Sequence, residues 1–484
     1  MQLSDLIDKS RIEGPANLNI TGVTADSRVV KNGFLFAGLP GSKADGSKFI
    51  ADAIAHGAKA VLVHAQASLP QIPQDVAVIK TENTRQDFAY IASRFYKKQP
   101  EHIVAVTGTS GKTSTVSFTQ QLWHLSGLKS CASLGTLGIS APGIKRYGRL
   151  TTPDTESLHA ELADLAAVGV THLAMEASSH GLHQYRLDGV HVKAAAYTNL
   201  SRDHLDYHET MDDYFLAKSR LFTELLEQDG TAIINSDDDY SDQLIGMCKE
   251  RGIRIIDFGQ EAENIKLLSR VPKPSGQEIE IEVFGERYSL TIPLVGDFQV
   301  MNALCALGLV LSKDSNPKDI VPLLEKLRGV PGRLQLVEGH PKGAVYVDYA
   351  HKPAALETVL KTFRPHTEGR LVCVFGCGGD RDAGKRPLMG QISSEHADLT
   401  IVTDDNPRSE NPESIRAQIL EAALGAKEIG DRREAISFSV ENLEQGDVLV
   451  IAGKGHEEGQ IIGKETLPFN DLEEAQSAIE KLQA

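Results

Sequence analysis

Short apolar runs alternate with longer amphipathic runs along most of the chain. Strand-like apolar runs lie at residues 33–37, 60–64, 76–80, 102–107, 172–176, 193–199, 231–235, 253–258, 344–347, 371–375, 399–402 and 447–452. Helical runs separate them, for example at residues 48–56, 84–97 and 470–482. Apolar strands followed by helix-length segments are typical of βαβ units, in which helices cover both faces of a parallel sheet. The pattern therefore predicts an α/β protein with mostly parallel sheets.

One segment has a different period. Residues 278–293 alternate apolar and polar positions around Gly285 and Glu286. A period of two marks a strand with one buried face, and a glycine between two such strands marks a turn. We expect an antiparallel hairpin here, at the edge of a sheet.

The chain divides into three blocks, as its length of 484 residues suggests. The first block covers residues 1–100, the second 101–332 and the third 333–484. Val330-Pro331-Gly332 has the composition of a linker between the last two. We predict a small N-terminal α/β domain, a central P-loop-type domain with a mostly parallel sheet, and a C-terminal Rossmann-like α/β domain.

A phosphate-binding loop opens the second block. Residues 104–115 read VAVTGTSGKTST, an apolar strand that runs into glycines and then a helix. Gly108 and Gly111 allow backbone N–H groups to approach an anion, and the helix N-terminus points at the same place. Lys112 supplies a charge for the outer phosphates and the Thr113 hydroxyl can bind Mg²⁺. Val106 replaces the first glycine of the full Walker pattern, but the context still predicts use of ATP or a related nucleotide.

Composition narrows the class of protein. The formal net charge of −16 argues against a nucleic-acid partner, which favours a basic surface. No apolar run is long enough to span a membrane, and the first residues resemble no signal peptide. Five scattered cysteines are typical of reduced core thiols. We expect a cytoplasmic monomer that neither binds nucleic acid nor inserts into a membrane.

Zinc is not expected. Cys373 and Cys377 have no second pair to complete a site. His456-Glu457 does not continue into His-Glu-x-x-His, because Gln460 occupies the last position.

Polar clusters follow two strands of the second block. Glu176 ends one strand, and Asn199, Asp203, His204 and Asp206 follow the next. Ligands bind beyond the carboxyl ends of strands in open α/β sheets, and a carboxylate beside a phosphate loop suits Mg²⁺. We therefore expect Glu176 and His204 to act near the nucleotide. By periodicity alone, Lys218 is a solvated surface lysine.

Three further polar residues lie in the second block and at the start of the third. Asn302 could read an adenine edge or cap a turn, and the sequence does not choose between them. Arg333 could clamp a phosphate or neutralise a developing charge. Asp348 lies at the carboxyl end of the first strand of the third block, as Glu176 does in the second block.

The third block contains a second anion-binding constellation. Three strand exits read GCGGDRD at 376–382, DDNPR at 404–408 and GKGHE at 453–457. Together they present Arg381 and Arg408 beside Asp405, Asn406 and Glu457. Arginine suits carboxylates and carboxylates suit ammonium groups, so the expected ligand is an amino acid, possibly one with two carboxylates.

These strings, in this order, resemble the Mur ligase family over essentially the whole chain. The matching residues are TGTSGKT at 107–113, EASSHG at 176–181, NLSRDHLD at 199–206, AK at 217–218, VPGR at 330–333, DYAH at 348–351 and the three strand exits of the third block. In the first block, DSR at 26–28 and DG at 45–46 also match. The resemblance implies an ATP-dependent ligase with UDP-sugar-binding, ATP-binding and amino-acid-binding domains. Its implied substrates are UDP-MurNAc-L-Ala-D-Glu, meso-diaminopimelate and ATP.

The resemblance also implies roles for individual residues. The UDP moiety would contact Ala25, Ser27, Ser42, Lys43 and Ala44. The muramoyl-peptide would contact Thr151, Thr152, Ser178, Gln184 and Arg186. The nucleotide would contact Gly108, Thr109, Ser110, Gly111, Lys112, Thr113, Ser114, Asn302, Arg333 and Asp348. Two Mg²⁺ sites would use Thr113, Glu176, His204 and Lys218, the last as a carbamate, and Lys112 and Arg333 would assist catalysis. Diaminopimelate would contact Arg381, Asp405, Asn406, Arg408, Gly453 and Glu457.

Arg408 is the residue that favours diaminopimelate. That amino acid has a second amino-carboxylate head, whose carboxylate needs a cationic partner, whereas lysine has no carboxylate there. Departures from the family pattern are Ser110 in place of Asn, Ser114 in place of Thr, and Gln335 in place of Glu.

Other functions predict different observations. A sibling ligase for lysine or glutamate, or a folylpolyglutamate synthetase, would share the ATP motifs but not the residues at 405–408. A nucleotide-dependent switch or mechanical ATPase would hydrolyse ATP without an acceptor and leaves the third-block arginines unexplained. A non-catalytic nucleotide-sugar-binding protein would have no use for Lys112, Glu176, His204 and Lys218.

Overall fold

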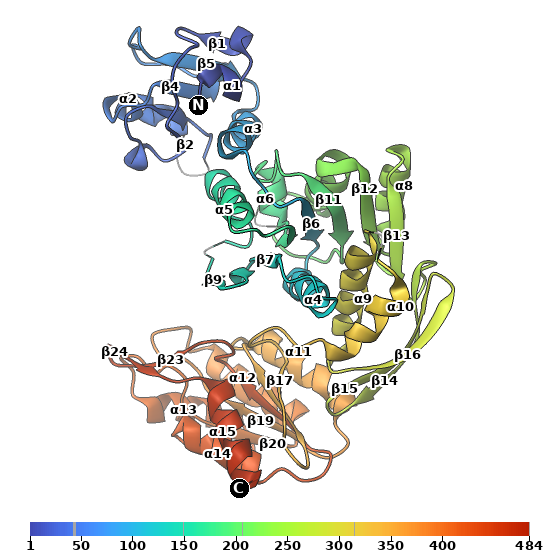
Figure 1. Ribbon diagram of the computed structural model, residues 1–484. Helices are drawn as coiled ribbons and strands as arrows, with labels where there is room; N and C mark the ends of the chain where they lie inside the picture. The colour runs from blue at the N-terminus through green and yellow to red at the C-terminus, as the bar shows by residue number, and fades with distance from the viewer. Residues whose placement is uncertain (42–44, 149, 206, 314, 484) are drawn as a thin grey trace. The chain divides into compact units, whose positions relative to one another are not determined.

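The computed structural model describes residues 1–41, 45–148, 150–205, 207–313 and 315–483. These residues form two compact units (Figure 1). The first contains Met1–Glu263 and Cys305–Ser315, and the second contains Asn264–Leu304 and Asn316–Ala484.

The first unit begins with a small five-stranded sheet in the order β1-β5-β4-β3-β2. Its strands are β1 (Ile12–Glu13), β2 (Gly22–Thr24), β3 (Phe34–Ala37), β4 (Ala60–His64) and β5 (Ala77–Thr81). Only β1 is antiparallel to its neighbour. The helices are α1 (Leu3–Leu6), α2 (Ile50–Ala55) and α3 (Thr84–Tyr96). The helix expected at 48–56 is shorter because Gly46–Phe49 form a 3₁₀ turn that precedes it.

The central sheet of the same unit contains the predicted βαβ units. Its order within the unit is β13-β12-β11-β6-β10-β7-β8-β9. The strands are β6 (His102–Thr107), β7 (Cys131–Gly135), β8 (Gly138–Ala141), β9 (Ile144–Arg146), β10 (His172–Glu176), β11 (Val192–Tyr197), β12 (Leu226–Asn235) and β13 (Arg254–Gly259). All pairs from β13 to β7 are parallel, as predicted, whereas β7, β8 and β9 form an antiparallel meander that the hydrophobic pattern did not reveal.

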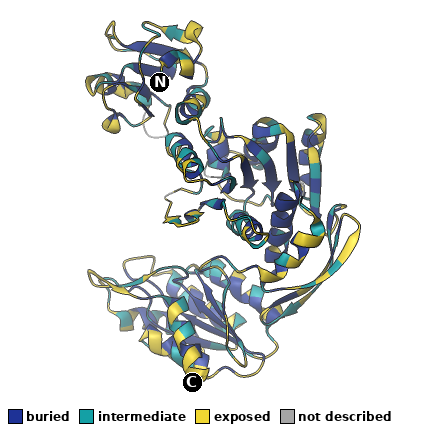
Figure 2. Ribbon diagram, viewed as in Figure 1, coloured by how far each residue is buried: buried dark blue, intermediate teal, exposed yellow. Residues whose placement is uncertain are grey.

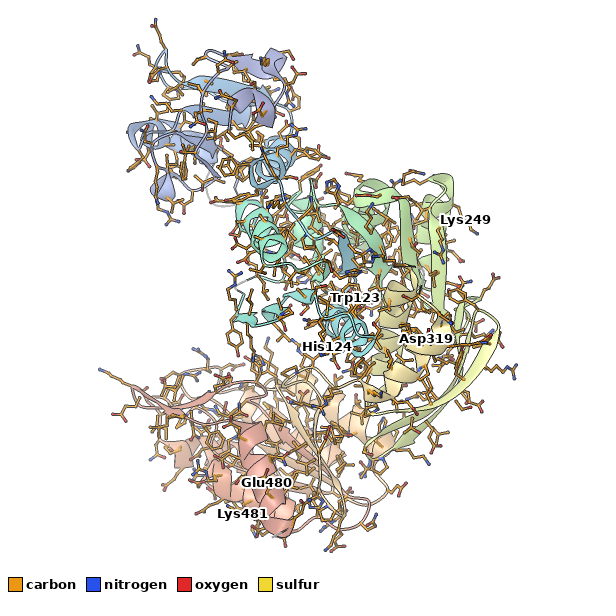
Figure 3. The ribbon with its side chains drawn as sticks, in the orientation of Figure 1. Trp123, His124, Lys249, Asp319, Glu480 and Lys481 are labelled. Atoms are coloured by element: carbon orange, nitrogen blue, oxygen red, sulfur yellow. The ribbon has the colours of Figure 1, made fainter. Side chains whose placement is uncertain are left out.

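Helices lie on both faces of the central sheet (Figure 1). They are α4 (Lys112–Leu125), α5 (Thr155–Ala167), α6 (Ser179–His183), α7 (Met211–Arg220) and α8 (Ser241–Glu250). A π-helical turn, Leu221–Leu225, continues α7. Trp123, the single tryptophan of the chain, lies near the end of α4 and is 4% exposed (Figure 3). Its ring packs against His172 at a centroid distance of 5.3 Å.

The second unit begins with an antiparallel ribbon. It consists of β14 (Ile265–Lys273), β15 (Gly276–Val283) and β16 (Glu286–Ile292). The β15–β16 pair confirms the hairpin predicted for 278–293, with its turn at Phe284 and Gly285. Helix α9 (Asp297–Leu311) follows and runs from the second unit into the first.

The C-terminal sheet has six strands in the order β17-β18-β22-β19-β20-β21. The strands are β17 (Gln335–Val337), β18 (Ala344–Asp348), β19 (Leu371–Phe375), β20 (Leu399–Val402), β21 (Lys427–Glu428) and β22 (Val448–Ala452), with a separate hairpin of β23 (Gly459–Ile462) and β24 (Glu465–Pro468). Only β17 is antiparallel to its neighbour in the sheet. The helices are α10 (Pro317–Ile320), α11 (Pro353–Phe363), α12 (Lys385–His396), α13 (Pro412–Leu420), α14 (Arg432–Glu441) and α15 (Asp471–Gln483).

Burial follows the alternation of side chains along the strands. In β22, Val448 and Val450 belong to the core on one face of the sheet, and Leu449 and Ile451 to the core on the other. Figure 2 shows the strands as buried ribbons under partly exposed helices. All five cysteines are free and buried, which confirms the prediction of core thiols. Among the described residues, no helix is long and apolar enough to cross a membrane.

Candidate active site

The loop after β6 has the geometry predicted for a phosphate-binding loop. All six residues of β6 are buried, and the chain leaves the strand at Gly108 with φ +150°. A Cβ at Gly108 would lie 1.9 Å from the Thr198 hydroxyl oxygen, so only glycine fits. Gly111, at φ +86°, is the residue before α4, so the first amide groups of that helix point toward the loop.

The segment after β11 fixes the shape of this loop. The Thr109 amide donates to the Asn199 carbonyl at 2.9 Å, and the Ser110 amide donates to Asn199 Oδ1 at 3.0 Å. The Thr198 hydroxyl donates to the Ser110 carbonyl at 2.6 Å. These bonds position the loop without using the side chain of Ser110, so the serine that departs from the family pattern leaves the loop intact.

Two lysines converge on one carbonyl oxygen. Lys112 Nζ and Lys218 Nζ each donate to the Gly108 carbonyl at 2.8 Å. Lys218 is 1% exposed and lies over the Tyr214 ring at 4.3 Å, so the expectation of a solvated lysine was wrong. The helix turns this residue toward the phosphate loop instead of solvent. Burial, and then the neighbouring Lys112 charge, lower the pKa of Lys218 well below its usual value.

Glu176 is a buried carboxylate beside the same loop. It ends β10 and is 1% exposed. Its Oε1 accepts from the Thr136 amide at 2.7 Å, and its Oε2 accepts from the Thr136 hydroxyl at 3.2 Å. Burial raises the pKa of Glu176, while the Thr136 amide, Lys112 and the Thr113 hydroxyl act in the opposite direction. A carboxylate with a neighbouring Thr113 hydroxyl is a donor set that fits a divalent cation.

His204 lies at the edge of this group. Its backbone has φ +53°, and its side chain is 46% exposed. Its Nε2 is 3.7 Å from Asp203 Oδ2, and its ring contacts that of His180 at 5.0 Å. No three His, Cys, Asp or Glu side chains of the described ranges gather as a ready metal-ligand set. A cation here would therefore need further oxygen ligands, such as those of phosphate or of a modified Lys218.

The residues expected to hold the muramoyl-peptide form one hydrogen-bonded cluster. The Thr152 hydroxyl donates to the Glu176 carbonyl at 2.9 Å and accepts from the Ser178 amide at 3.0 Å. Arg186 donates to the Thr152 carbonyl at 2.9 Å and to Gln184 Oε1 at 2.8 Å. Thr151 reaches the cluster through the Thr136 hydroxyl at 3.1 Å. The structure thus brings all five residues together beside Glu176.

Two of the five residues predicted to contact the UDP moiety, Ala25 and Ser27, lie in the small N-terminal sheet region. Ala25 is exposed and Ser27 is buried at the start of a 3₁₀ turn, which Asp26 caps by accepting from the Arg28 amide at 3.0 Å. Ser42, Lys43 and Ala44 lie outside the described residues. Their assignment stays a prediction.

Three residues of the nucleotide prediction belong to the second unit. Asn302 lies inside α9, is 4% exposed and donates to Gln299 Oε1 at 3.1 Å, so it caps no turn. Asp348 accepts from the Leu334 and Ala350 amides, each at 2.8 Å. Arg333 is exposed on the segment that Asp348 holds. Gly332 lies so close to the 453–457 loop that a Cβ on Gly332 would lie 2.3 Å from the backbone nitrogen of His456.

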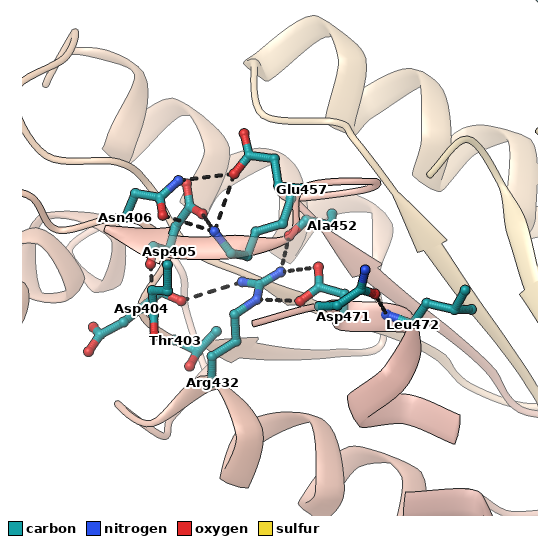
Figure 4. Close-up of polar contacts among 12 residues, drawn as sticks. Thr403, Asp404, Asp405, Asn406, Arg432, Ala452, Glu457, Asp471 and Leu472 are labelled. Carbon is teal, nitrogen blue, oxygen red and sulfur yellow. Dashed lines mark hydrogen bonds and ion pairs between the residues drawn. The ribbon is translucent and has the colours of Figure 1, made fainter. Parts of the chain in front are cut away.

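Four of the predicted amino-acid-binding residues gather beyond β20 and β22 (Figure 4). Asn406 donates from Nδ2 to Glu457 Oε2 at 3.1 Å, and its Oδ1 accepts from the Ile461 amide at 2.9 Å. Asp405 is 8% exposed and precedes Asn406, and Gly453 (φ +118°) opens the loop that carries Glu457. Two basic residues that the sequence analysis missed support this cluster: Lys454 and Arg432. Lys454 could have been found from its position between two glycines at a strand exit, whereas Arg432 has no such signal.

The two predicted arginines differ. Arg408, at φ +52°, donates from Nη1 to the Gly379 carbonyl at 2.8 Å and forms no ion pair with the described residues. A Cβ at Gly379 would lie 2.0 Å from the Pro407 carbonyl oxygen. The absence of a side chain at Gly379 is therefore what lets the 376–382 loop approach the segment that carries Arg408. Arg381 is exposed, and its recorded bond is to the adjacent Asp380 carbonyl at 3.3 Å. The structure therefore brings Arg408 to the cluster but not Arg381.

Comparison with known proteins identifies the class. Three domain models of one family match successive parts of the chain: "Mur ligase family, catalytic domain" at residues 19–96, "Mur ligase middle domain" at 106–310 and "Mur ligase, glutamate ligase domain" at 332–455. Together with the phosphate loop and the fold, these matches show that the chain belongs to the Mur ligase family.

Within the family, full-length relatives share one name. The chain is 51% identical over 467 residues to the UDP-N-acetylmuramoyl-L-alanyl-D-glutamate–2,6-diaminopimelate ligase of Agrobacterium fabrum, covering 96% of this chain and 94% of the relative. It is 50% identical to the ligase of the same name from Mesorhizobium japonicum, covering 99% of both chains. A solved structure of a ligase with that name superposes with a TM-score of 0.79 at 34% identity, covering 100% of this chain and 99% of the other.

Proposed function

We propose that this protein is an ATP-dependent amide ligase of peptidoglycan precursor synthesis. It joins meso-diaminopimelate to the D-glutamyl carboxylate of UDP-MurNAc-L-Ala-D-Glu and forms ADP and phosphate. The observation that carries the proposal is the convergence of Lys112 and Lys218 on the phosphate loop beside buried Glu176. The names of the full-length relatives supply the choice of substrates.

The first step activates the D-glutamyl carboxylate of UDP-MurNAc-L-Ala-D-Glu. A carboxylate oxygen attacks the γ-phosphorus of ATP, the bond to the β-phosphate oxygen breaks, and an acyl phosphate and ADP form. Lys112 and the amides at the start of α4 neutralise the charge that spreads over the phosphoryl oxygens. The cluster of Thr152, Ser178 and Arg186 holds the peptide so that its carboxylate faces the loop.

Thr113, Glu176, His204 and a carbamylated Lys218 would hold the magnesium ions. When bound there, Mg²⁺ would offset the negative charge of the phosphate groups. A neutral amine is the form that reacts with carbon dioxide, and the lowered pKa of Lys218 favours that form. Mass spectrometry after trapping the protein with labelled bicarbonate tests the carbamate: label on Lys218 supports it, and label absent from Lys218 contradicts it.

The second step uses the third domain. The amine of the amino acid attacks the acyl carbon, the bond to the phosphate oxygen breaks, and a proton leaves the nitrogen. Asp405, Asn406, Arg408 and Glu457 orient the far end of the amino acid. Arg333 approaches the phosphate when the third domain closes, which makes catalysis depend on a seated amino acid.

The domain roles follow from this reaction. Residues 1–100 bind UDP-MurNAc, residues 101–332 bind ATP, and residues 333–484 bind the amino acid. We further propose that the protein acts in the cytoplasm and as a monomer.

The test is phosphate release from ATP in the presence of UDP-MurNAc-L-Ala-D-Glu. Three acceptor conditions are compared: meso-diaminopimelate, L-lysine and no amino acid. Release only with meso-diaminopimelate supports the proposal. Equal release with lysine would overturn the choice of amino acid, and release that is indifferent to both would favour a plain ATPase.

Two variants localise the amino-acid site. Arg408→Ala should lower kcat/KM for meso-diaminopimelate by about 10²-fold, since an arginine–carboxylate contact typically contributes a few kcal/mol. Arg433→Ala removes the same charge from an exposed position in the same domain, where Arg433 pairs with Glu474, and should leave the rate unchanged. Equal losses in both variants would argue against a role for Arg408 in substrate binding.

A further inference from the structure

Lys454 is a buried lysine in the amino-acid cluster of the third domain. It follows β22, and its side chain is 0% exposed. Gly453 and Gly455 on either side have φ values of +118° and +56°, so the chain turns sharply and drives the lysine inward. A lysine is almost never fully buried unless it is paired. Its partners therefore indicate its role.

All three donors of the ammonium group have acceptors. Lys454 Nζ lies 2.9 Å from Asn406 Oδ1, 3.4 Å from Asp405 Oδ1 and 3.3 Å from Glu457 Oε2. Because Asn406 Oδ1 accepts from Lys454 and from the Ile461 amide, its Nδ2 must face Glu457. Lys454 thus fixes the orientation of three side chains that would contact the ligand.

The same contacts set the charge of the cluster. Asp405 and Glu457 bring two negative charges and Lys454 brings one positive charge, which leaves one negative charge. Arg432 below adds no net charge, because it is paired with Asp471 at 2.7 Å and both side chains are 0% exposed (Figure 4). The Glu457 side chain is 36% exposed, so the remaining charge is accessible to a ligand.

The positively charged guanidinium of Arg408 lies beside this net negative charge. Arg408 is two residues from Asn406 and donates a weak bond to its carbonyl at 3.4 Å. The pair of opposite charges is complementary to an amino-carboxylate head, which is a zwitterion. It is less complementary to a lone ammonium, which would leave Arg408 without a carboxylate.

We propose that Lys454 is a specificity-determining positioning residue, which keeps the cluster at one net negative charge and so favours a zwitterionic head over a lone ammonium. The inference rests on the proposed function, since it names how that amino-acid site discriminates. Lys454 acts through Asp405, Asn406 and Glu457 and does not touch the reacting atoms.

Removal of Lys454 should change selectivity as well as rate. Lys454→Met leaves two carboxylates without their buried cation, so the site attracts a lone ammonium more and a zwitterion relatively less. We expect the ratio of kcat/KM for meso-diaminopimelate to that for L-lysine to fall by about tenfold or more, with KM for ATP unchanged, because a tenfold change needs only about 1.4 kcal/mol. Lys427→Met, which removes the same charge from the exposed strand β21, is the matched control and should leave the ratio unchanged.

A charge-restoring variant separates electrostatics from folding. Lys454→Met combined with Asp405→Asn returns the cluster to one net negative charge, so the ratio should recover relative to Lys454→Met alone. If Lys454→Met alone does not fold, the double variant is compared with Asp405→Asn. In that comparison the loss of Lys454 must lower the ratio of kcat/KM for meso-diaminopimelate to that for L-lysine. A ratio that does not move in either background overturns the inference. Failure of the wild-type protein to release phosphate with meso-diaminopimelate would instead overturn the proposed function.

Discussion

Glu176 illustrates a conflict between stability and activity at a single residue. Burial raises its pKa, which means that ionising this carboxyl group costs more free energy in the folded than in the unfolded protein. Such residues are retained where chemistry needs them. The neighbouring residue Gly135 leaves room for this carboxylate, because a Cβ there would lie 2.2 Å from Glu176 Oε1.

We predict that Glu176→Gln gains stability and loses activity. The amide keeps the shape of the side chain and can still accept from the Thr136 amide, but the buried charge is gone. The thermal midpoint should rise, while acceptor-dependent phosphate release should fall by about 10²-fold or more, as for loss of one strong electrostatic contact in an active site. Calorimetry and the phosphate assay measure both. A lower midpoint together with lost activity would show that Glu176 is needed for folding instead.

At the scale of elements, the phosphate loop depends on the exit from β11. Thr198 and Asn199 hold the loop, and Gly108 approaches Thr198 so closely that no side chain fits. The loop and its support come from two adjacent parallel strands, β6 and β11. The anion site is therefore a property of the strand pair and not of the loop sequence alone.

Gly108→Ala should displace the loop and abolish nucleotide binding. The added methyl group would clash with the Thr198 hydroxyl at 1.9 Å, and it would also strain a backbone with positive φ. Titration with ATP, followed by the fluorescence of Trp123 on α4, measures the effect. Gly127→Ala is the control, because its φ is also positive but nothing lies within 4 Å of the new Cβ. Adding Thr198→Ala to Gly108→Ala should recover part of the binding if the clash dominates.

Two helices of the C-terminal sheet are joined by a buried ion pair. Arg432 begins α14 and Asp471 begins α15, and their side chains are both 0% exposed. Asp471→Asn should lower the free energy of unfolding by about 3–5 kcal/mol, because it leaves a buried guanidinium uncompensated. Denaturant unfolding of the wild type and of Asp471→Asn measures this difference in the free energy of unfolding.

The next residue along α14 provides the comparison. Arg433 pairs with Glu474 with side chains 64% and 18% exposed, so Glu474→Gln should change stability by at most about 1 kcal/mol. Similar losses in the two variants would contradict the distinction between the buried and the exposed pair.

Several elements could be predicted from the sequence, and others could not. The strands at 60–64, 102–107, 172–176, 371–375 and 399–402 match the structure residue for residue, because short apolar runs between helices leave little choice. The meander β7–β9 was not predicted because its three strands are short and lack a clear period: β7 is mostly buried, whereas β8 and β9 are partly exposed. The glycine positions 108 and 111 revealed the phosphate loop, since only glycine tolerates that backbone.

The missed parts of the site depend on contacts between distant residues. Periodicity placed Lys218 on a surface, but its acceptor is 110 residues away at Gly108. Lys454 contacts Asn406, which is 48 residues away, and although the two glycines around Lys454 mark a strand exit, they do not reveal this partner. Family resemblance could name such residues, whereas only the folded chain shows which ones share a partner.

At the scale of the whole molecule, the C-terminal sheet is joined to the antiparallel ribbon within the second unit. His366 is 2% exposed, and its Nε2 accepts from the Gly296 amide at 3.1 Å. Its Nδ1 lies 2.9 Å from the Lys273 carbonyl and 3.1 Å from the Gly276 carbonyl, which fixes Nδ1 as the donor. Val295 packs into the core of the C-terminal sheet, so the attachment is apolar as well as polar.

The attachment should weaken in acid. Burial, opposed by the two carbonyl contacts, lowers the pKa of His366, with nearby Arg270 lowering it and Asp297 raising it. The unfolded chain therefore binds more protons than the folded chain, and stability falls as pH drops below about 6.5, the ordinary value for histidine. His366→Gln keeps a donor and an acceptor without a titratable group. Denaturant unfolding at pH 5 and pH 7.5, followed by circular dichroism, should show a smaller difference in the variant, and an equal difference would contradict the role of His366.

Because Gly332 contacts the 453–457 loop closely, the segment 330–332 is held against that loop. A Cβ at Gly455 would lie 2.9 Å from the Gly332 carbonyl oxygen, so the two backbones touch with no side chain between them. Arg333 is the next residue after Gly332. A movement of the loop that carries Lys454 and Glu457 would therefore act on the backbone beside Arg333. In the proposed function, this contact would couple binding of the amino acid to the position of Arg333.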